Sequence, residues 1–191
     1  VSRALRELPD VKPETIAMVK AVAQKYNYLP NPIAQGLVNK RSFNIGVIIP
    51  DFMIHFYAEA LSGIYKVANE AGYNVMVCQT NEKYQNELVS LRTLVSNRVD
   101  GLIVAISKDT TDFEHLNALS SKRIPLVVFN RISDKIHASK VMFDDFNSAY
   151  IATKHLIDNG CRHIAHIAGP STLQLSTDRH AGYKAALESY N

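Results

Sequence analysis

The sequence predicts a doubly wound α/β fold, a parallel sheet with helices on both faces, preceded by a small helical segment. From residue 43 onward, short apolar runs alternate with amphipathic stretches, the order typical of chains that build parallel sheets. The apolar runs are mostly continuous rather than alternating, as expected when helices cover both faces of a sheet. The first 29 residues lack such runs and show helical spacing instead.

Six short apolar runs are the predicted strands of this sheet. None approaches the roughly 18 residues that a membrane-spanning helix requires, so we expect no membrane association. The runs are "NIGVIIP" (44–50), "NVMVCQT" (74–80), "GLIVAIS" (101–107), "PLVVFN" (125–130), "SKVMFDD" (139–145) and "HIAHIAG" (163–169).

Amphipathic stretches between the runs are the predicted helices. Residues 56–71 place apolar side chains on one helical stripe and stop at Gly72, a favoured residue beyond a helix C-terminus. Residues 87–96 and 112–121 follow the same spacing, and residues 146–159 end at a second glycine. Helices and strands therefore alternate along the chain.

Polar side chains follow several predicted strands. Open α/β sheets bind ligands in the crevice outside the carboxyl ends of their strands, so these positions predict a site for a small polar molecule. The alternative is that loops after strands are polar in any α/β protein. The positions are Asp51, Ser107, Asn130 with Arg131, and Asp144 with Asp145.

Positive charge is concentrated near the N-terminus. Residues 1–41 carry seven basic and three acidic side chains, a net charge of +4, whereas the remainder carries −1. Within this segment, residues 1–8 and 13–26 have helical spacing, and Pro13 suits an early helix position. Two short helices with a basic surface match part of a DNA-binding unit, and an ordinary solvated surface is the alternative.

The stretch "NYLPNPIAQGLVNKRS", residues 27–42, contains a helix that is too weak to stand alone. Pro32 to Lys40 is spaced as a helix but covers about two turns, and isolated helices below roughly 12 residues are marginal in water. Gly36 in its interior costs about 1 kcal/mol more. Such a helix is expected to fold only with a partner.

Taken in order, several motifs resemble the LacI and GalR family of bacterial transcription regulators. The motifs are "VSRAL", "NYLPNPIAQGL", "NIGVIIPD", "VDGLIV", "IPLVVFNR", "HLIDNGCRHIAHIAG" and "DRHAGYKAAL". The resemblance covers almost the whole chain. It implies a helix-turn-helix that reads an operator, a hinge helix in the minor groove, and a two-lobed effector-binding core that dimerises.

The resemblance divides the chain into four segments. Residues 1–29 correspond to a partial helix-turn-helix, 30–42 to the hinge, 43–145 to the first lobe and 146–191 to the start of the second lobe. The chain begins at Val1 without an initiating Met and stops inside the expected second lobe, so we expect it to be a fragment of a longer protein.

DNA contacts are implied at both ends of this basic segment. Arg3 stands where an arginine of the family approaches base edges, and a guanidinium fork suits guanine O6 and N7. Leu37 corresponds to the apolar wedge that enters between base steps, which kinks DNA. A solvated helix face is the alternative for the first positions. The implied DNA-binding residues are Ser2, Arg3, Asn31, Ala34 and Leu37.

The effector site is carried over position by position from the family. It combines planar hydrogen-bonding groups with aromatic faces, which suits the hydroxyls and the apolar side of a sugar ring. The implied effector-binding residues are Asp51, Phe56, Tyr57, Asn130, Arg131, Phe143 and Arg179.

The chain also departs from the family pattern at this site. Ile54 and His55 replace the usual Asn-Pro pair, and Asn130 stands where aspartate is common. A phosphorylated or acidic ligand is an alternative to a sugar, through Arg131 and Arg179. A structural salt bridge is the alternative role for Arg179.

Other chemistry is not indicated. His163 and His166 are separated by an odd spacing, so on a strand they would point to opposite faces and could not share a metal ion. No phosphate-binding loop, GxGxxG or nucleophile elbow occurs, and we predict no catalytic residue, cofactor or metal. Only two cysteines and no export signal suggest a reducing cytoplasm.

The sequence therefore predicts a cytoplasmic, sequence-specific DNA-binding regulator controlled by a small effector, a sugar or sugar derivative. We expect a homodimer, because hinge helices and operator half-sites work in pairs, with helices 56–72 and 87–99 as candidates for the interface. A sugar-binding protein of a transport system is the first alternative. An enzyme on a flavodoxin-like sheet is the second, and it would need a catalytic constellation that we do not find.

Overall fold

A computed structural model describes residues 1–28 and 41–190 of the chain. The chain divides into two compact units, Val1–Ser42 and Phe43–Asn191. The hinge stretch that the sequence analysis singled out, including Asn31, Ala34 and Leu37, lies outside the described residues.

The first unit contains two helices. α1 spans Ser2–Leu5 and α2 spans Pro13–Lys25, with Pro13 at the first helical position as predicted. The first helix is shorter than the eight residues expected, because the backbone of Glu7 adopts a positive φ of 51° that ends it. Ala4 is buried where α1 packs on α2.

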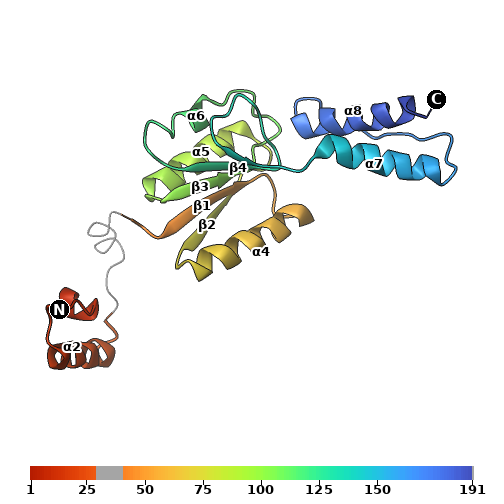
Figure 1. The fold of residues 1–191 in the computed structure, drawn as a ribbon. Helices are drawn as coiled ribbons and strands as arrows, with labels where there is room; N and C mark the ends of the chain where they lie inside the picture. The colour runs from red at the N-terminus through yellow and green to blue at the C-terminus, as the bar shows by residue number, and fades with distance from the viewer. Residues whose placement is uncertain (29–40, 191) are drawn as a thin grey trace. The chain divides into compact units, whose positions relative to one another are not determined.

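The second unit is built on a parallel sheet, and the predicted α/β fold is confirmed (Figure 1). All four strand pairings are parallel, in the order β2-β1-β3-β4-β5. The order reverses at β1, so the crevice expected of a doubly wound sheet lies outside the carboxyl ends of β1 and its neighbours. The strands are β1 Asn44–Ile49, β2 Asn74–Gln79, β3 Gly101–Val104, β4 Leu126–Phe129 and β5 Ser139–Val141.

Helices cover the two faces of this sheet. α4, His55–Glu70, packs on one face over a core that includes Val47, Ile49 and Tyr57. On the other face, α5, Tyr84–Ser96, and α6, Glu114–Asn117, enclose a larger core around Leu94. Adjacent residues of β1 thus face opposite cores, as the continuous apolar runs predicted.

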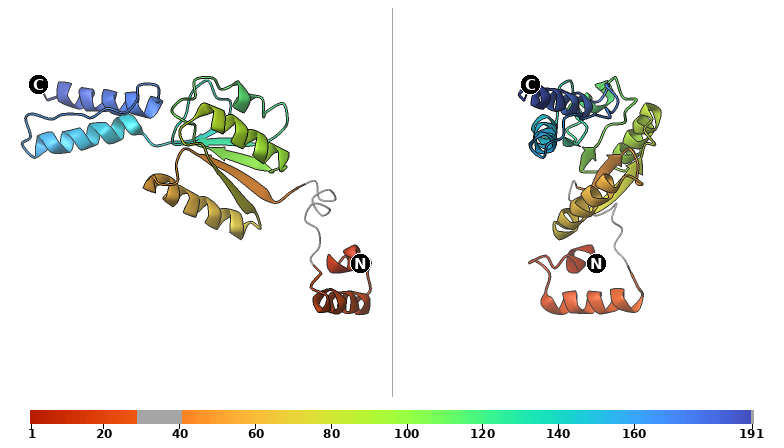
Figure 2. Two further views of the ribbon diagram at one scale, coloured as in Figure 1. Left: turned by 180° about the vertical axis from the view of Figure 1, so that it is seen from behind. Right: turned by 90° about the vertical axis from the view of Figure 1, so that its right-hand side faces the viewer.

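The last two helices lie side by side, as both views of Figure 2 show. α7 spans Asp145–Asp158, and α8 spans Gln174–Glu188. Their backbones come close at Gly182, where an added Cβ would stand 2.1 Å from the carbonyl oxygen of Phe146. No side chain fits at this position without a shift of the backbone.

Some predicted boundaries are confirmed and others are wrong. Gly72 and Gly160 have φ of 76° and 85° just beyond α4 and α7, as expected of glycines that end helices. The helix predicted over 112–121 is reduced to α6 followed by turns. The fifth strand ends at Val141, short of the predicted residue 145, because Asp145 begins α7.

The strand predicted over 163–169 is wrong. "HIAHIAG" has no regular secondary structure in the part of the chain that is described. A strand requires a neighbour for its backbone hydrogen bonds, and the five-stranded sheet supplies none to this run. Ile167 is 98% exposed as a result. The predicted opposite orientation of His163 and His166 therefore has no structural basis here.

Among the described residues, no helix is both long and apolar enough to cross a bilayer.

Candidate functional site

A cavity of about 790 Å³ lies within the second unit, at the carboxyl ends of the strands. Its wall is formed by the segment after β1, the residues that follow β4 and β5, the facing sides of α7 and α8, and the segment between these two helices. Six of the seven predicted effector-binding residues line it. These are Phe56, Tyr57, Asn130, Arg131, Phe143 and Arg179.

Aromatic rings form one part of this wall. Phe56 contacts Phe143 edge-on, with ring centroids 6.0 Å apart, and it contacts Tyr57 at 5.3 Å. Phe143 is 58% exposed, although it is a large apolar side chain. An exposed aromatic ring in the cavity wall is suited to stack on the apolar side of a ligand ring.

Tyr57 joins this aromatic wall to the end of β4. Its ring is 1% exposed, and its hydroxyl accepts a hydrogen bond of 3.2 Å from Nδ2 of Asn130. Burial raises the pKa of the Tyr57 phenol above its ordinary 10.0, against the lowering effect of the nearby Arg131 charge. Asn130 itself adopts a positive φ of 59°. Backbone strain of this kind persists only where the surroundings enforce it, and it is concentrated at functional sites.

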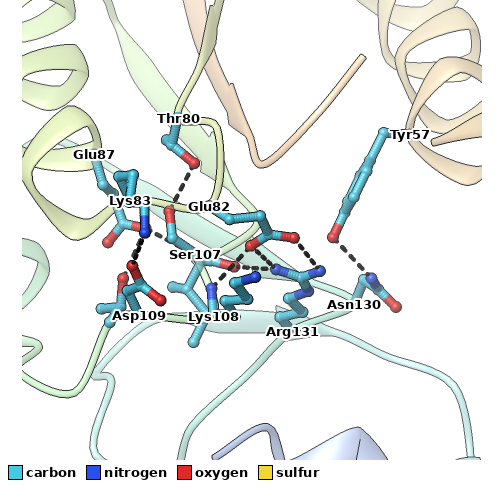
Figure 3. A network of polar contacts seen from close by, with 12 residues as sticks. Tyr57, Thr80, Glu82, Lys83, Glu87, Ser107, Lys108, Asp109, Asn130 and Arg131 are labelled. Carbon is cyan, nitrogen blue, oxygen red and sulfur yellow. Dashed lines mark hydrogen bonds and ion pairs between the residues drawn. The ribbon is translucent and has the colours of Figure 1, made fainter. Parts of the chain in front are cut away.

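Arg131 is held by an ion pair with Glu82, a residue of the loop after β2. Nη1 donates to Oε2 at 2.6 Å and Nη2 donates to Oε1 at 2.7 Å, in the parallel arrangement shown in Figure 3. Nη1 also donates to the carbonyl of Ile106 at 3.2 Å. Glu82 accepts a further bond from the amide of Lys108 at 3.0 Å. The ends of β2, β3 and β4 are thereby joined.

The pKa values of this pair follow from the contacts. Burial acts to raise the pKa of Glu82, but the hydrogen bonds from Arg131 and from the Lys108 amide outweigh it, so the pKa is lowered. Burial likewise acts to lower the pKa of Arg131, and the bond to Glu82 reverses the direction. Both groups are therefore charged at neutral pH.

A second carboxylate, that of Glu87, binds the loop after β3. Glu87 on α5 is fully buried, and its Oε2 accepts from the Ser107 amide at 2.7 Å and from Oγ1 of Thr110 at 3.1 Å. Its Oε1 lies 2.8 Å from Nε2 of His115. Three donors around one buried carboxylate fix the segment after β3, which carries Lys108 to its contact with Glu82.

Arg179 reaches the cavity from α8. Its Nε donates to Oδ1 of Asp145 at 2.7 Å, and both residues line the cavity. The structural ion pair that the sequence left as an alternative for Arg179 is thus present. The side chain of Arg179 remains 49% exposed. Asp144, the neighbouring carboxylate, instead caps α7 by accepting from the Asn147 amide at 3.0 Å.

Asp51 is the predicted residue that lies outside the cavity lining. Its Oδ1 accepts from the amide of Met53 at 2.9 Å, so it shapes the turn after β1. Glu82 was not predicted, since it has no signal in the sequence beyond its place after a strand. His166, considered only as a metal ligand in the sequence, lines the cavity and stacks on Tyr183 with ring centroids 5.0 Å apart.

The predicted DNA-contacting residues of the first unit lie on α1. Ser2 is exposed, and Arg3 is exposed and forms an ion pair with Asp10. Lys20 of α2 pairs with Glu7 in the same unit. A surface pair of this kind contributes little to stability, so the arginine can exchange its carboxylate for another anion at small cost.

No group of three or more His, Cys, Asp or Glu side chains is placed to hold a metal ion in residues 1–28 and 41–190. Both cysteines, Cys78 and Cys161, are free thiols.

Comparisons with known proteins agree with this geometry. Residues 42–190 match the sequence model of a family described as "Periplasmic binding proteins and sugar binding domain of LacI family". A ribose operon repressor from Halalkalibacterium halodurans is 33% identical over 188 residues, which are 98% of this chain and 55% of that protein.

Two solved structures share the fold. The lac repressor dimer bound to operator and the anti-inducer ONPF has a TM-score of 0.84 at 25% identity, covering 99% of this chain and 57% of that one. The Cra transcriptional dual regulator from Pseudomonas putida, in complex with fructose 1-phosphate, has a TM-score of 0.72 at 25% identity, covering 78% and 55%. The chain spans a little over half the length of these relatives, which are named as regulators of transcription and not as enzymes.

Proposed function

Because the chain belongs to the family of periplasmic binding proteins and LacI-type sugar-binding domains, we propose that the full-length protein is an operator-binding transcription regulator controlled by a small effector. The cavity at the strand ends holds the effector, a sugar or sugar derivative. The first unit and the hinge stretch bind DNA. The protein acts as a cytoplasmic homodimer, since operator half-sites pair with two-fold symmetric proteins.

The composition of the cavity wall carries the effector half of this proposal. Asn130 and Arg179 offer planar hydrogen-bonding groups, while Phe56 and Phe143 offer aromatic faces. Hydroxyl groups of a sugar match the first kind of group, and the apolar face of its ring matches the second. Most of the remaining wall comes from α7, from α8 and from the segment between them, so a ligand would touch the strand ends and the helix pair at once.

The basic segment carries the DNA half. Residues 1–41 have a net charge of +4, which favours a polyanion. Ser2 and Arg3 are proposed to contact the operator, together with Asn31, Ala34 and Leu37 of the hinge stretch. A hinge helix too weak to fold alone would fold when it meets DNA and its symmetry partner. Effector binding then need only separate the two hinges to weaken the complex.

Binding assays on the full-length protein test both halves. Thermal unfolding is followed across a panel of sugars and sugar phosphates, including D-ribose and fructose 1-phosphate, and each ligand that shifts the transition is added to an operator-binding assay. We expect at least one ligand to raise the melting temperature and to change operator affinity. A panel that changes neither would refute the effector half.

The hinge has its own test. Replacing Leu37 by Ala removes the proposed wedge, so operator bending should be lost while effector binding is retained. Bending is measured by the mobility of circularly permuted operator fragments. Unchanged bending and unchanged operator affinity in the variant would contradict the proposed role of Leu37. A sugar-binding protein of a transport system would bind sugar without responding to any operator.

A further inference from the structure

We infer that Glu82 determines the charge selectivity of the effector cavity. Glu82 occupies both Nη atoms of Arg131 and so neutralises the charge of the wall at the strand ends. The cavity therefore takes an uncharged polyhydroxylated ligand in preference to the phosphorylated form of that ligand. This inference rests on the proposed function of the cavity. Glu82 is a positioning residue, since it acts through Arg131 and is not part of the cavity lining.

The geometry of the ion pair is the first support. A guanidinium binds a phosphate by presenting two parallel N–H groups to two oxygens. In this structure those two groups of Arg131 are already directed at Oε1 and Oε2 of Glu82, at 2.7 and 2.6 Å. Nη1 is further engaged by the carbonyl of Ile106. A ligand phosphate would have to displace a carboxylate from an arrangement of the same shape.

The burial of the pair is the second support. The side chains of Arg131 and Glu82 are 12% and 19% exposed. Separating two opposite charges in such a place leaves one of them without a partner and poorly hydrated, which costs much more than separating a surface pair. The exchange of Glu82 for a ligand anion is therefore unfavourable.

The backbone around Glu82 is the third support. Asn81 and Glu82 have successive positive φ angles of 52° and 62°, a conformation that side chains other than glycine rarely adopt. Asn130, adjacent to Arg131, is in the same region. The carboxylate and the guanidinium are thus joined by two strained turns, and the amide of Lys108 fixes Oε2 from a third loop. The carboxylate of Glu82 is thus held by the guanidinium of one loop and by the amide of another.

The charges of the remaining wall complete the argument. Arg179 is the other arginine in the lining, and Asp145, also in the lining, accepts from its Nε. Each arginine of the cavity therefore has a carboxylate of its own. Apart from His166, no further titratable cation lines the cavity in the described part of the chain. The wall offers hydrogen bonds without a net positive charge, which suits hydroxyl groups better than a phosphate.

Inorganic phosphate is the probe that tests this inference without knowledge of the effector. Glu82→Gln keeps the size of the side chain, but its Nε2 cannot accept, so at least one N–H of Arg131 loses its partner. We expect phosphate to bind the full-length Glu82→Gln protein at least about tenfold more tightly than wild type, as a new charge-assisted pair of hydrogen bonds would give. Binding is measured by calorimetric titration.

Two further variants control this measurement. Asp134→Asn removes one negative charge from an exposed pair with Lys140 and leaves the cavity unchanged, so its phosphate affinity should equal that of wild type. The double variant Glu82→Gln/Arg131→Gln should lose the gained affinity. Equal phosphate binding by Glu82→Gln and Asp134→Asn would overturn the inference, and so would a gain that survives in the double variant.

A measurement on the wild-type protein covers the case in which Glu82→Gln does not fold. A guanidinium held by two hydrogen bonds to one carboxylate rotates slowly about its Nε–Cζ bond. We therefore expect separate Nη proton resonances for Arg131 in nuclear magnetic resonance spectra. A single averaged resonance at low temperature would overturn the inference. The proposed function fails separately, when no sugar changes operator affinity, whatever the phosphate titrations give. The matched ligands D-ribose and D-ribose 5-phosphate connect the two, because Glu82→Gln should shift their affinity ratio toward the phosphate.

Discussion

Arg179 of α8 donates from Nε to Oδ1 of Asp145, the first residue of α7, at 2.7 Å. The two partners differ in their surroundings, since the side chain of Asp145 is 8% exposed and that of Arg179 is 49% exposed. The carboxylate therefore depends on the guanidinium more than the guanidinium depends on the carboxylate. The amide dipoles at the start of α7 supply the other stabilisation of this charge.

Replacing Arg179 by Ala should destabilise the protein by about 1–3 kcal/mol, because it leaves the buried Asp145 carboxylate without its side-chain donor. Urea unfolding at pH 7 measures the change. Arg179→Ala combined with Asp145→Asn should recover part of the loss, since the double variant has no buried charge to satisfy. Stability within about 0.5 kcal/mol of wild type, the usual range for surface positions, would show that the pair has no structural role.

Replacing Glu87 by Gln should destabilise the second unit by about 2–4 kcal/mol, because the amide nitrogen cannot accept and one of the three buried donors loses its partner. The donors come from Ser107, Thr110 and His115. Glu59→Gln is the matched control, an exposed position on α4 that we expect to be neutral. Equal unfolding midpoints of the two variants in urea would contradict the prediction.

Two glycines should respond to alanine in opposite directions. Gly182→Ala places a Cβ against the backbone of Phe146 and should cost at least about 1–3 kcal/mol. At Gly63, inside α4, nothing lies within 4 Å of an added Cβ, so Gly63→Ala should stabilise the protein by about 0.5–1 kcal/mol. Thermal unfolding of both variants provides the comparison. A stabilising Gly182→Ala would mean that α7 and α8 do not approach as described.

The contribution of Glu82 to the free energy of unfolding should decrease as the pH is lowered. The pKa of Glu82 is lowered in the fold from an ordinary value of 4.5, so its stabilising effect is present above that value and is lost as the pH falls through the folded pKa. The difference in unfolding free energy between wild type and Glu82→Gln should therefore be constant near neutral pH and shrink on acidification below about 4.5. A difference that grows toward low pH would reverse the assigned direction.

The positions of the strands could be predicted because each buried strand is a run of apolar residues. Val47 and Ile48 face opposite cores, and a continuous run is the pattern that two covered faces impose. The run at 163–169 satisfies the same pattern but is not a strand, since strand formation also requires a neighbouring backbone. The hydrophobic pattern of one segment does not show whether another strand lies beside it to accept and donate backbone hydrogen bonds.

The candidate site could be predicted only in part, for a related reason. Asn130 and Arg131 were found because they follow a strand and match a family motif. Glu82 also follows a strand, but its importance lies in its contact with Arg131, 49 residues away in the chain. Glu87 gave no signal, because one carboxylate near the start of an amphipathic helix usually faces solvent. Its complete burial is visible only when its three donors are placed around it.

The close approach of α7 and α8 at Gly182 restricts how the two helices can move. Helices whose backbones are in contact cannot slide past one another, so we expect α7 and α8 to move as one rigid body about a hinge in the segment after β5. A ligand that moves Arg179 toward the cavity would also move Asp145, its hydrogen-bond partner. Because Asp145 begins α7, this displacement would reach β5 at the edge of the sheet. The distance between a spin label on α7 and one on α8 should be the same with and without ligand. The distance from either label to a third label on α4 should change when the ligand binds.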